Sequence, residues 1–212
     1  MGTGCKTAAA AGLFPLPDFF LSVTMPRMLE AFLVSTGVVA LAEMGDKTQL
    51  LALMLAARYR SHLPIVLGIA VATLANHALA ALFGAWIASL AGAEAMRWIL
   101  AASFIAMGAW VLVPDKADDL SEGKRRFGVF GTTLIAFFLV EIGDKTQIAT
   151  VALAARYAQT MAVVAGTTLG MLVANVPAVY LGNALLRRVP LRLLQRVAAA
   201  MFAVLGVLVL LA

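Results

Sequence analysis

Charged residues are scarce in this sequence of 212 residues. Asp, Glu, Lys and Arg make up 13% of the chain and hydrophobic residues make up 63%. An ordinary soluble domain has about 25% charged and about 45–50% apolar residues. So few polar side chains could not cover a soluble globule, and so apolar a composition is not that of a disordered chain. The composition therefore predicts a membrane protein.

Cysteine and histidine are almost absent, with one and two residues respectively. This excludes a disulfide-stapled domain and argues against zinc or copper sites, because those metals favour thiolate and imidazole ligands. The motifs H-E-x-x-H and G-x-S-x-G are also missing, which argues against two common classes of hydrolase. We therefore expect that the chain is not an enzyme and needs no cofactor.

Long apolar runs fill most of the chain. A helix that crosses a bilayer needs about 20 apolar residues, and charged or proline-bearing breaks divide this sequence into six suitable segments. The predicted spans are residues 29–58, 63–90, 95–113, 127–156, 160–186 and 190–211. The sequence thus predicts an all-α polytopic membrane protein with six transmembrane helices.

The distribution of Lys and Arg predicts the orientation, because cytoplasmic loops carry an excess of positive charge. Ten of these residues lie in or beside the hairpins that follow the first, third and fifth spans, and four lie on the opposite side. Both termini are therefore expected outside. The net charge of +5 is therefore explained by positively charged cytoplasmic loops. It does not indicate nucleic-acid binding, and no nucleic-acid partner is expected.

Two segments fall outside this membrane pattern. Residues 1–27 form an N-terminal extension, which we expect to be disordered or to precede the true start of the chain, because the strong apolar pattern begins at Met28. Residues 114–126 carry a cluster of charges and are expected to be a cytoplasmic linker. The linker separates two halves, residues 28–113 and 127–212.

The two halves are copies of one unit. Residues 43–59 and 141–157 align at an offset of 98 residues with 11 of 17 positions identical, and Gly68 recurs as Gly166. Each unit has three predicted spans, an odd number, so the second copy enters the membrane from the opposite side. Inverted repeats of this kind are typical of secondary transporters, whose substrate site lies near the midplane between the repeats.

Four acidic residues lie near the middle of predicted spans, two in each repeat. They are Glu43, Asp46, Glu141 and Asp144. Ionisable groups at this depth are costly, and a functional role is the default hypothesis for them. The structural alternative is an ion pair, either of Asp46 with Lys47 or of a carboxylate with the lysine of the other repeat.

Helix periodicity brings the polar residues of each motif together. Positions i, i+3 and i+4 share one helix face, so Glu43, Asp46 and Lys47 are predicted to point the same way, as are their equivalents in the second repeat. Gly45 and Gly143 lie inside the motifs. They are expected to let each long helix bend or break and offer its backbone to a ligand.

Facing one another, the two motifs would form a site of hard oxygen ligands. The predicted ligands are Glu43, Asp46, Thr48, Gln49, Glu141, Asp144, Thr146 and Gln147. Carboxylate and amide oxygens suit Ca²⁺, Mn²⁺ or Mg²⁺. With Lys47 and Lys145, the four carboxylates have a formal charge of −2, which one divalent cation balances. Crowded, desolvated carboxylates take up protons when the cation leaves, so the site predicts cation/proton exchange.

Two asparagines are candidates for a second polar layer. Asn76 and Asn175 lie near the centres of the second and fifth spans, one residue out of the 98-residue register. Each could supply an amide oxygen to the site, or form a hydrogen bond between helices instead. Both roles stay open at the level of sequence.

The motif E-x-G-D-[KR]-[TS], present at residues 43–48 and 141–146, resembles that of the Gdt-one type of membrane cation/proton exchangers. The resemblance covers about residues 28–212. It implies transport of Mn²⁺ and Ca²⁺ in exchange for protons, with the motif acids as ion ligands. It further implies a bacterial manganese exporter of the inner membrane.

A second function within transport is export of a small organic cation or an amino acid. Such a substrate would need a larger cavity, and four acids would repel a carboxylate. We therefore expect a multi-pass exporter of Mn²⁺, or of Ca²⁺, since the ligand set suits both ions. The expected partners are the divalent cation, protons and the lipid bilayer, and whether the chain forms a homo-oligomer stays open.

Overall fold

Eight helices and no strand run through residues 17–113, 127–182 and 191–211, the part of the chain that a computed structural model describes. The first half contains α1 (Pro17–Glu43), α2 (Lys47–Tyr59), α3 (His62–Leu90) and α4 (Ala93–Val111). The second half contains α5 (Gly128–Glu141), α6 (Lys145–Tyr157), α7 (Thr160–Leu181) and α9 (Leu191–Leu211). The all-helical class predicted from the sequence is confirmed for these residues.

Four of these helices, α3, α4, α7 and α9, are long and apolar enough to cross a membrane. The pair α1 and α2 also qualifies when taken together, although the chain bends by 71° between them, whereas α5 is shorter. Large apolar side chains cover the outside, and Trp86, Leu90 and Trp98 are each more than half exposed. So much exposed apolar surface suits lipid rather than water. The described helices thus provide four or five candidate spans of a multi-pass membrane protein.

The first helix begins earlier than the sequence pattern predicts. α1 starts at Pro17, so residues 17–27 are helical in the structure. Proline is well suited to a first helical turn, because the N–H group that it lacks would have no intrahelical acceptor there. Residues 1–16 of the extension and the charged linker at residues 114–126 lie outside the described residues.

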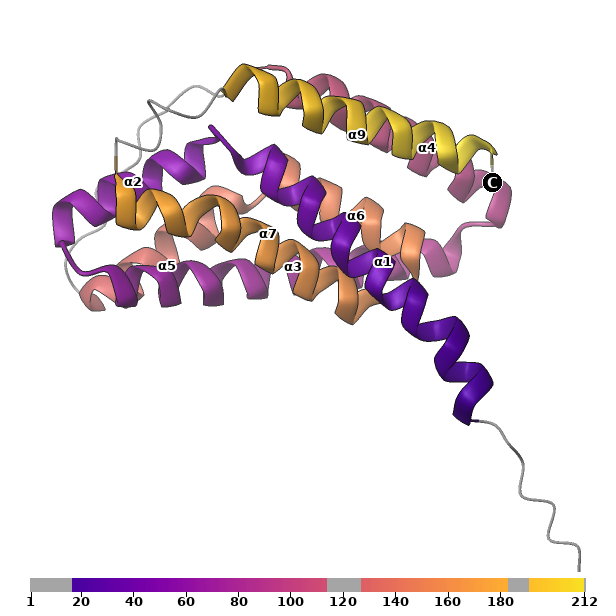
Figure 1. Cartoon of the computed structure of the whole chain (residues 1–212), viewed down its shortest axis with the longest axis horizontal. Helices are drawn as coiled ribbons and strands as arrows, with labels where there is room; N and C mark the ends of the chain where they lie inside the picture. The colour runs from indigo at the N-terminus through magenta and orange to yellow at the C-terminus, as the bar shows by residue number, and fades with distance from the viewer. Residues whose placement is uncertain (1–16, 114–126, 183–190, 212) are drawn as a thin grey trace, which may run out of the picture.

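The helices of one half pack mainly against those of the other. α1 packs on α7, α3 on α5, and α4 on α9. Figure 1 shows α4 and α9 side by side along one edge of the molecule, with the remaining helices beneath them. Phe104 of α4 and Phe202 of α9 are fully buried between the two helices, with ring centroids 6.4 Å apart.

Close contacts between helices recur at the offset of 98 residues. A Cβ atom on Gly68 of α3 would lie 2.8 Å from the Cβ of Thr133 in α5, and one on Gly166 of α7 would lie 3.0 Å from the Cβ of Ser35 in α1. Gly68 and Gly166 are repeat equivalents, and so are Ser35 and Thr133. Each contact is therefore the copy of the other with the two halves exchanged, which is the pattern of an approximate two-fold axis.

The outer pair of helices shows the same exchange. A Cβ atom on Gly108 of α4 would lie 3.0 Å from the carbonyl oxygen of Ala199 in α9, and one on Gly206 of α9 would lie 3.2 Å from that of Ala101 in α4. The later residue of each helix thus meets the earlier residue of its partner. α4 and α9, which are repeat equivalents, consequently run antiparallel.

Candidate cation site

Both sequence motifs coincide with a break between two helices. α1 gives way to α2 at residues 44–46, and α5 gives way to α6 at residues 142–144. Gly45 and Gly143 lie in these breaks with φ angles of 86° and 76°. Glycine enters this region of backbone conformation without the steric penalty that a Cβ atom would bring. The chain thus bends where the two motif glycines stand.

The breaks change how the motif side chains meet. Helix periodicity predicts that Glu43, Asp46 and Lys47 share a face of one helix, and this prediction is wrong, because the helix is not continuous through the motif. Glu43 is the last residue of α1, Asp46 is the N-cap of α2 with extended backbone, and Lys47 begins α2. Asp144 is likewise the N-cap of α6. Both aspartates therefore lie at helix N-termini, whose unpaired N–H groups favour negative charge.

Two glutamine side chains form hydrogen bonds with the backbone of the breaks. Oε1 of Gln49 accepts a hydrogen bond from the backbone N–H of Gly45 at 3.0 Å, and Oε1 of Gln147 accepts one from Gly143 at 2.7 Å. The amide nitrogen of Gln49 also donates to the carbonyl oxygen of Ala174 in α7, at 2.9 Å. The two amide oxygens that were expected to face a cation are thus bound to the backbone of the breaks.

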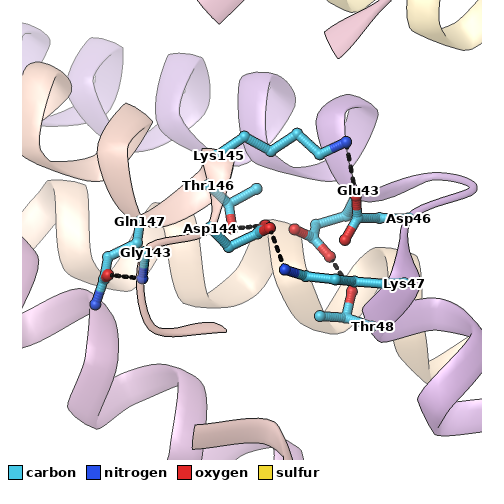
Figure 2. A network of polar contacts seen from close by, with 9 residues as sticks. All are labelled: Glu43, Asp46, Lys47, Thr48, Gly143, Asp144, Lys145, Thr146 and Gln147. Atoms are coloured by element: carbon cyan, nitrogen blue, oxygen red, sulfur yellow. Dashed lines mark hydrogen bonds and ion pairs between the residues drawn. The ribbon is translucent and has the colours of Figure 1, made fainter. Parts of the chain in front are cut away.

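Three buried carboxylates from both halves converge between the breaks. Oxygen atoms of Glu43, Asp46 and Asp144 lie within 4.8 Å of one another, and each residue is at most 3% exposed. Figure 2 shows their side chains directed into one space, with those of Glu43 and Asp46 facing that of Asp144. One cation could contact all three, because Ca²⁺–oxygen distances are about 2.3–2.6 Å. We call these three residues the carboxylate cluster.

Each motif lysine forms an ion pair with an acid of the other half. Nζ of Lys47 lies 2.9 Å from Oδ1 of Asp144, and Nζ of Lys145 lies 2.7 Å from Oδ1 of Asp46 (Figure 2). Each lysine therefore pairs with the aspartate of the other repeat, which is one of the ion-pair alternatives that the sequence leaves open. The side chain of Lys145 is 3% exposed and that of Lys47 is 30% exposed, so the two pairs are buried to different depths.

The motif threonines contact motif acids. Oγ1 of Thr48 donates a hydrogen bond to Oε2 of Glu43, and Oγ1 of Thr146 lies 3.5 Å from Oδ2 of Asp144 as a donor. Both hydroxyl groups are fully buried. They stand beside the carboxylate cluster, and each contacts an oxygen atom of one of its acids.

The fourth motif acid, Glu141, is bound to α3 and lies outside the carboxylate cluster. Its Oε1 accepts a hydrogen bond from Oγ1 of Thr73 at 2.9 Å, and its Oε2 accepts one from Nδ2 of Asn76 at 3.3 Å. The same Asn76 nitrogen donates to the carbonyl oxygen of Phe138 in α5, at 3.0 Å. Asn76 thus forms the interhelical hydrogen bond that was one of its two expected roles.

The side-chain amide of Asn175 forms its hydrogen bonds within its own helix, α7. Its Nδ2 donates to the carbonyl oxygen of Met171 at 3.1 Å and lies 2.9 Å from the sulfur of the same residue. The site also contains a residue that sequence reasoning missed, Thr73. Thr73 precedes Asn76 by three residues and so shares its helix face, a signal that could have identified it. The repeat offered no such signal, because the equivalent position holds Met171.

Comparison with known proteins identifies the family of this chain. The model of the family described as divalent cation/proton antiporter GDT1 matches residues 31–119 and 129–212, one match to each half. A protein of Vibrio cholerae serotype O1, named "Putative manganese exporter", is 49% identical over 177 residues, which is 83% of this chain and 88% of that protein. No solved structure matches. The chain therefore belongs to the divalent cation/proton antiporter GDT1 family.

Proposed function

We propose that this chain exports Mn²⁺ across the cell membrane in exchange for protons. The carboxylate cluster of Glu43, Asp46 and Asp144 carries the proposal, because its three negative charges are only partly compensated by two lysines. With Glu141, the buried site has a formal charge of −2 (four carboxylates and two lysines). One divalent cation would neutralise that charge.

The chemistry of the ligands supports a hard divalent cation as the substrate. Within the described residues, no cysteine or histidine joins the carboxylate cluster, and carboxylate oxygens favour Mn²⁺, Ca²⁺ and Mg²⁺ over softer metals. The name of the Vibrio cholerae relative favours Mn²⁺ among these ions. Export of Mn²⁺ rather than Ca²⁺ is therefore our proposal for this chain.

Proton exchange follows from the electrostatics of the same site. Carboxylates that are crowded and removed from water cannot all stay ionised once the balancing cation leaves. Uptake of protons by the cluster would restore neutrality and prepare it for return to the other side of the membrane. The same groups would thus carry the cation in one direction and protons in the other.

We also infer a six-span architecture of two inverted repeats, with α1/α2 and α5/α6 each forming one broken span. The exchanged contacts of Gly68 and Gly166 support an approximate two-fold axis, and the antiparallel course of α4 and α9 supports an axis that lies across the helices. Broken helices with a site at the break are common in transporters with inverted repeats. Both termini would face outward from the inner membrane, as the charge distribution indicates.

The test uses the full chain in proteoliposomes that contain reporters of Mn²⁺ and of pH. We expect Mn²⁺ flux coupled to opposite proton flux. Glu43→Gln and Asp144→Asn should each reduce Mn²⁺ flux about tenfold or more, because even the hydrogen-bond partners of metal ligands typically contribute about 10–100-fold. Glu94→Gln is the matched control, since Glu94 is an exposed acid in the first turn of α4.

Four outcomes would contradict separate parts of this proposal. Unchanged Mn²⁺ flux in both site variants would remove the carboxylate cluster as the transport site. Mn²⁺ flux without proton flux would remove the exchange mechanism. Faster flux of Ca²⁺ than of Mn²⁺ would contradict the assigned ion, and transport of an organic cation in place of either metal would favour the second function considered above.

A further inference from the structure

The two repeats hold their glutamates differently. Both carboxylate oxygens of Glu141 accept hydrogen bonds from α3, one from Thr73 at 2.9 Å and one from Asn76 at 3.3 Å. The repeat equivalents of Thr73 and Asn76 are Met171 and Ala174 in α7, whose side chains have no hydrogen atom to donate. The arrangement around Glu141 therefore has no counterpart in the other half, although the motifs themselves are nearly identical.

Glu43, the repeat equivalent of Glu141, has one carboxylate oxygen that accepts no hydrogen bond from the described residues. Its Oε2 accepts the hydrogen bond from Thr48, while its buried Oε1 accepts none among the described residues. Glu43 also lies with Asp46 and Asp144 in the carboxylate cluster. A cation in the cluster could therefore bind Oε1 of Glu43, whereas Glu141, held by two donors of α3, lies outside the cluster and would have to move to reach the cation.

We propose that Thr73 and Asn76 are positioning residues, an α3 latch that holds Glu141 out of the carboxylate cluster and gives the two motif glutamates different roles. This inference rests on the proposed function. Glu43 binds the cation together with the two aspartates, and Glu141 joins them only when it leaves α3. Because Asn76 also donates to Phe138 in the last turns of α5, release of Glu141 is linked to the contact between α3 and α5.

The latch has a physical reason in the number of charged ligands. The affinity of an oxygen site for a divalent cation rises with the count of charged ligands. A fourth carboxylate held permanently in the cluster would bind Mn²⁺ more tightly, and a tightly held ion leaves slowly. By withholding Glu141, the α3 latch keeps the site weak enough for release.

The first test measures the KM and the maximal rate of Mn²⁺ transport for Thr73→Val in proteoliposomes. Loss of one hydrogen bond to a charged group should lower the KM about tenfold, and the maximal rate should fall as well. Thr73→Ser keeps the hydroxyl group and should retain wild-type values. Thr167→Val is the matched control, because Thr167 is a buried threonine of α7 whose hydroxyl donates only to carbonyl oxygens of its own helix.

A second test transposes the latch to the other half. The variant combines four substitutions: Thr73→Met, Asn76→Ala, Met171→Thr and Ala174→Asn. In the wild type, Glu43→Gln should raise the KM for Mn²⁺ more than Glu141→Gln does. In the transposed background the order should reverse, because the new donors on α7 would then hold Glu43.

The results separate the latch from the function on which it rests. Absence of Mn²⁺/proton exchange in wild-type vesicles would overturn both. An active wild type with an unchanged KM in Thr73→Val would overturn the α3 latch alone. A fall in maximal rate at constant KM that Thr73→Ser does not restore would assign Thr73 to helix packing, and it would overturn the latch in the same way.

Discussion

At the scale of single residues, the two motif lysines are equivalent in sequence but not in their surroundings. Lys145 is almost completely buried against Asp46, at 3% exposure, whereas Lys47 is 30% exposed beside Asp144. Removal of one partner from a buried ion pair leaves a charge that neither water nor a counter-ion compensates. A partly exposed pair is screened by solvent and contributes less. The same substitution should therefore have unequal effects at the two positions.

We predict that Lys145→Met lowers the free energy of unfolding by about 3–5 kcal/mol, and that Lys47→Met lowers it by about 1 kcal/mol. Thermal unfolding in detergent measures the difference. The double variant Lys145→Met/Asp46→Asn should recover much of the loss, because it removes both members of the buried pair. Equal losses in the two single variants would show that the ion pairs do not differ in burial as described.

At the scale of elements, the breaks between α1 and α2 and between α5 and α6 place the site. A continuous helix would have its first-turn N–H groups and last-turn carbonyls only at its two ends, far from the motif acids. The breaks bring helix termini to the motifs, and there the aspartates occupy the N-cap positions. Gly143 permits the second break through its φ of 76°, and a Cβ atom at this position would meet nothing within 4 Å.

We predict that Gly143→Ala destabilises the protein by about 1–2 kcal/mol, the cost of left-handed backbone for a residue with a Cβ atom. The cause is backbone conformation alone, because the added methyl group has open space. Gly143→Asn should cost less, since asparagine tolerates this conformation better. Unfolding midpoints in detergent give the comparison. Gly92→Ala is the control, with equally open space at a negative φ, and a loss there as large as at Gly143 would refute the explanation.

At the scale of the whole molecule, the exchange of contacts between the halves is the main organising feature. α1 packs on α7 and α3 on α5, so neither half encloses the carboxylate cluster by itself. The distribution of Lys and Arg predicts that the loop between α2 and α3 faces the cytoplasm and that the loop between α3 and α4 faces outward. The side of the membrane that each loop faces can be measured by cysteine labelling.

We predict opposite accessibility for single cysteines at Ser61 and Glu94. The only native cysteine is Cys5, so a Cys5→Ser background carries one new thiol at a time. A membrane-impermeant thiol reagent should label Glu94→Cys in intact cells, and it should label Ser61→Cys only after permeabilisation, because Arg58 and Arg60 place that loop inside. The reverse pattern would invert the proposed orientation, and labelling of both on one side would exclude a span between them.

Sequence alone was sufficient for the parts of the protein that depend on local pattern. Apolar runs indicated a membrane environment and helical spans, and the 98-residue offset indicated two related halves. The motif acids stood out because charge is rare in this chain. Helix bounds within a few residues follow from such patterns, as α3 and α4 show by beginning one and two residues before their predicted starts. The start of α1 at Pro17 was missed because Pro15, Pro17 and Asp18 interrupt the apolar pattern there.

Only the tertiary structure decided which polar groups meet. Offsets of three and four residues assume a continuous helix, and the breaks at Gly45 and Gly143 remove that assumption inside both motifs. Partners distant in sequence, such as Thr73 and Glu141, have no periodicity to reveal them. The repeat relates residues within equivalent helices, but it does not say which helices cross. The composition and the repeat therefore determined a membrane protein with paired acidic motifs. The packing of α3 against α5 and α6 decided that three of the four acids cluster and one is held aside.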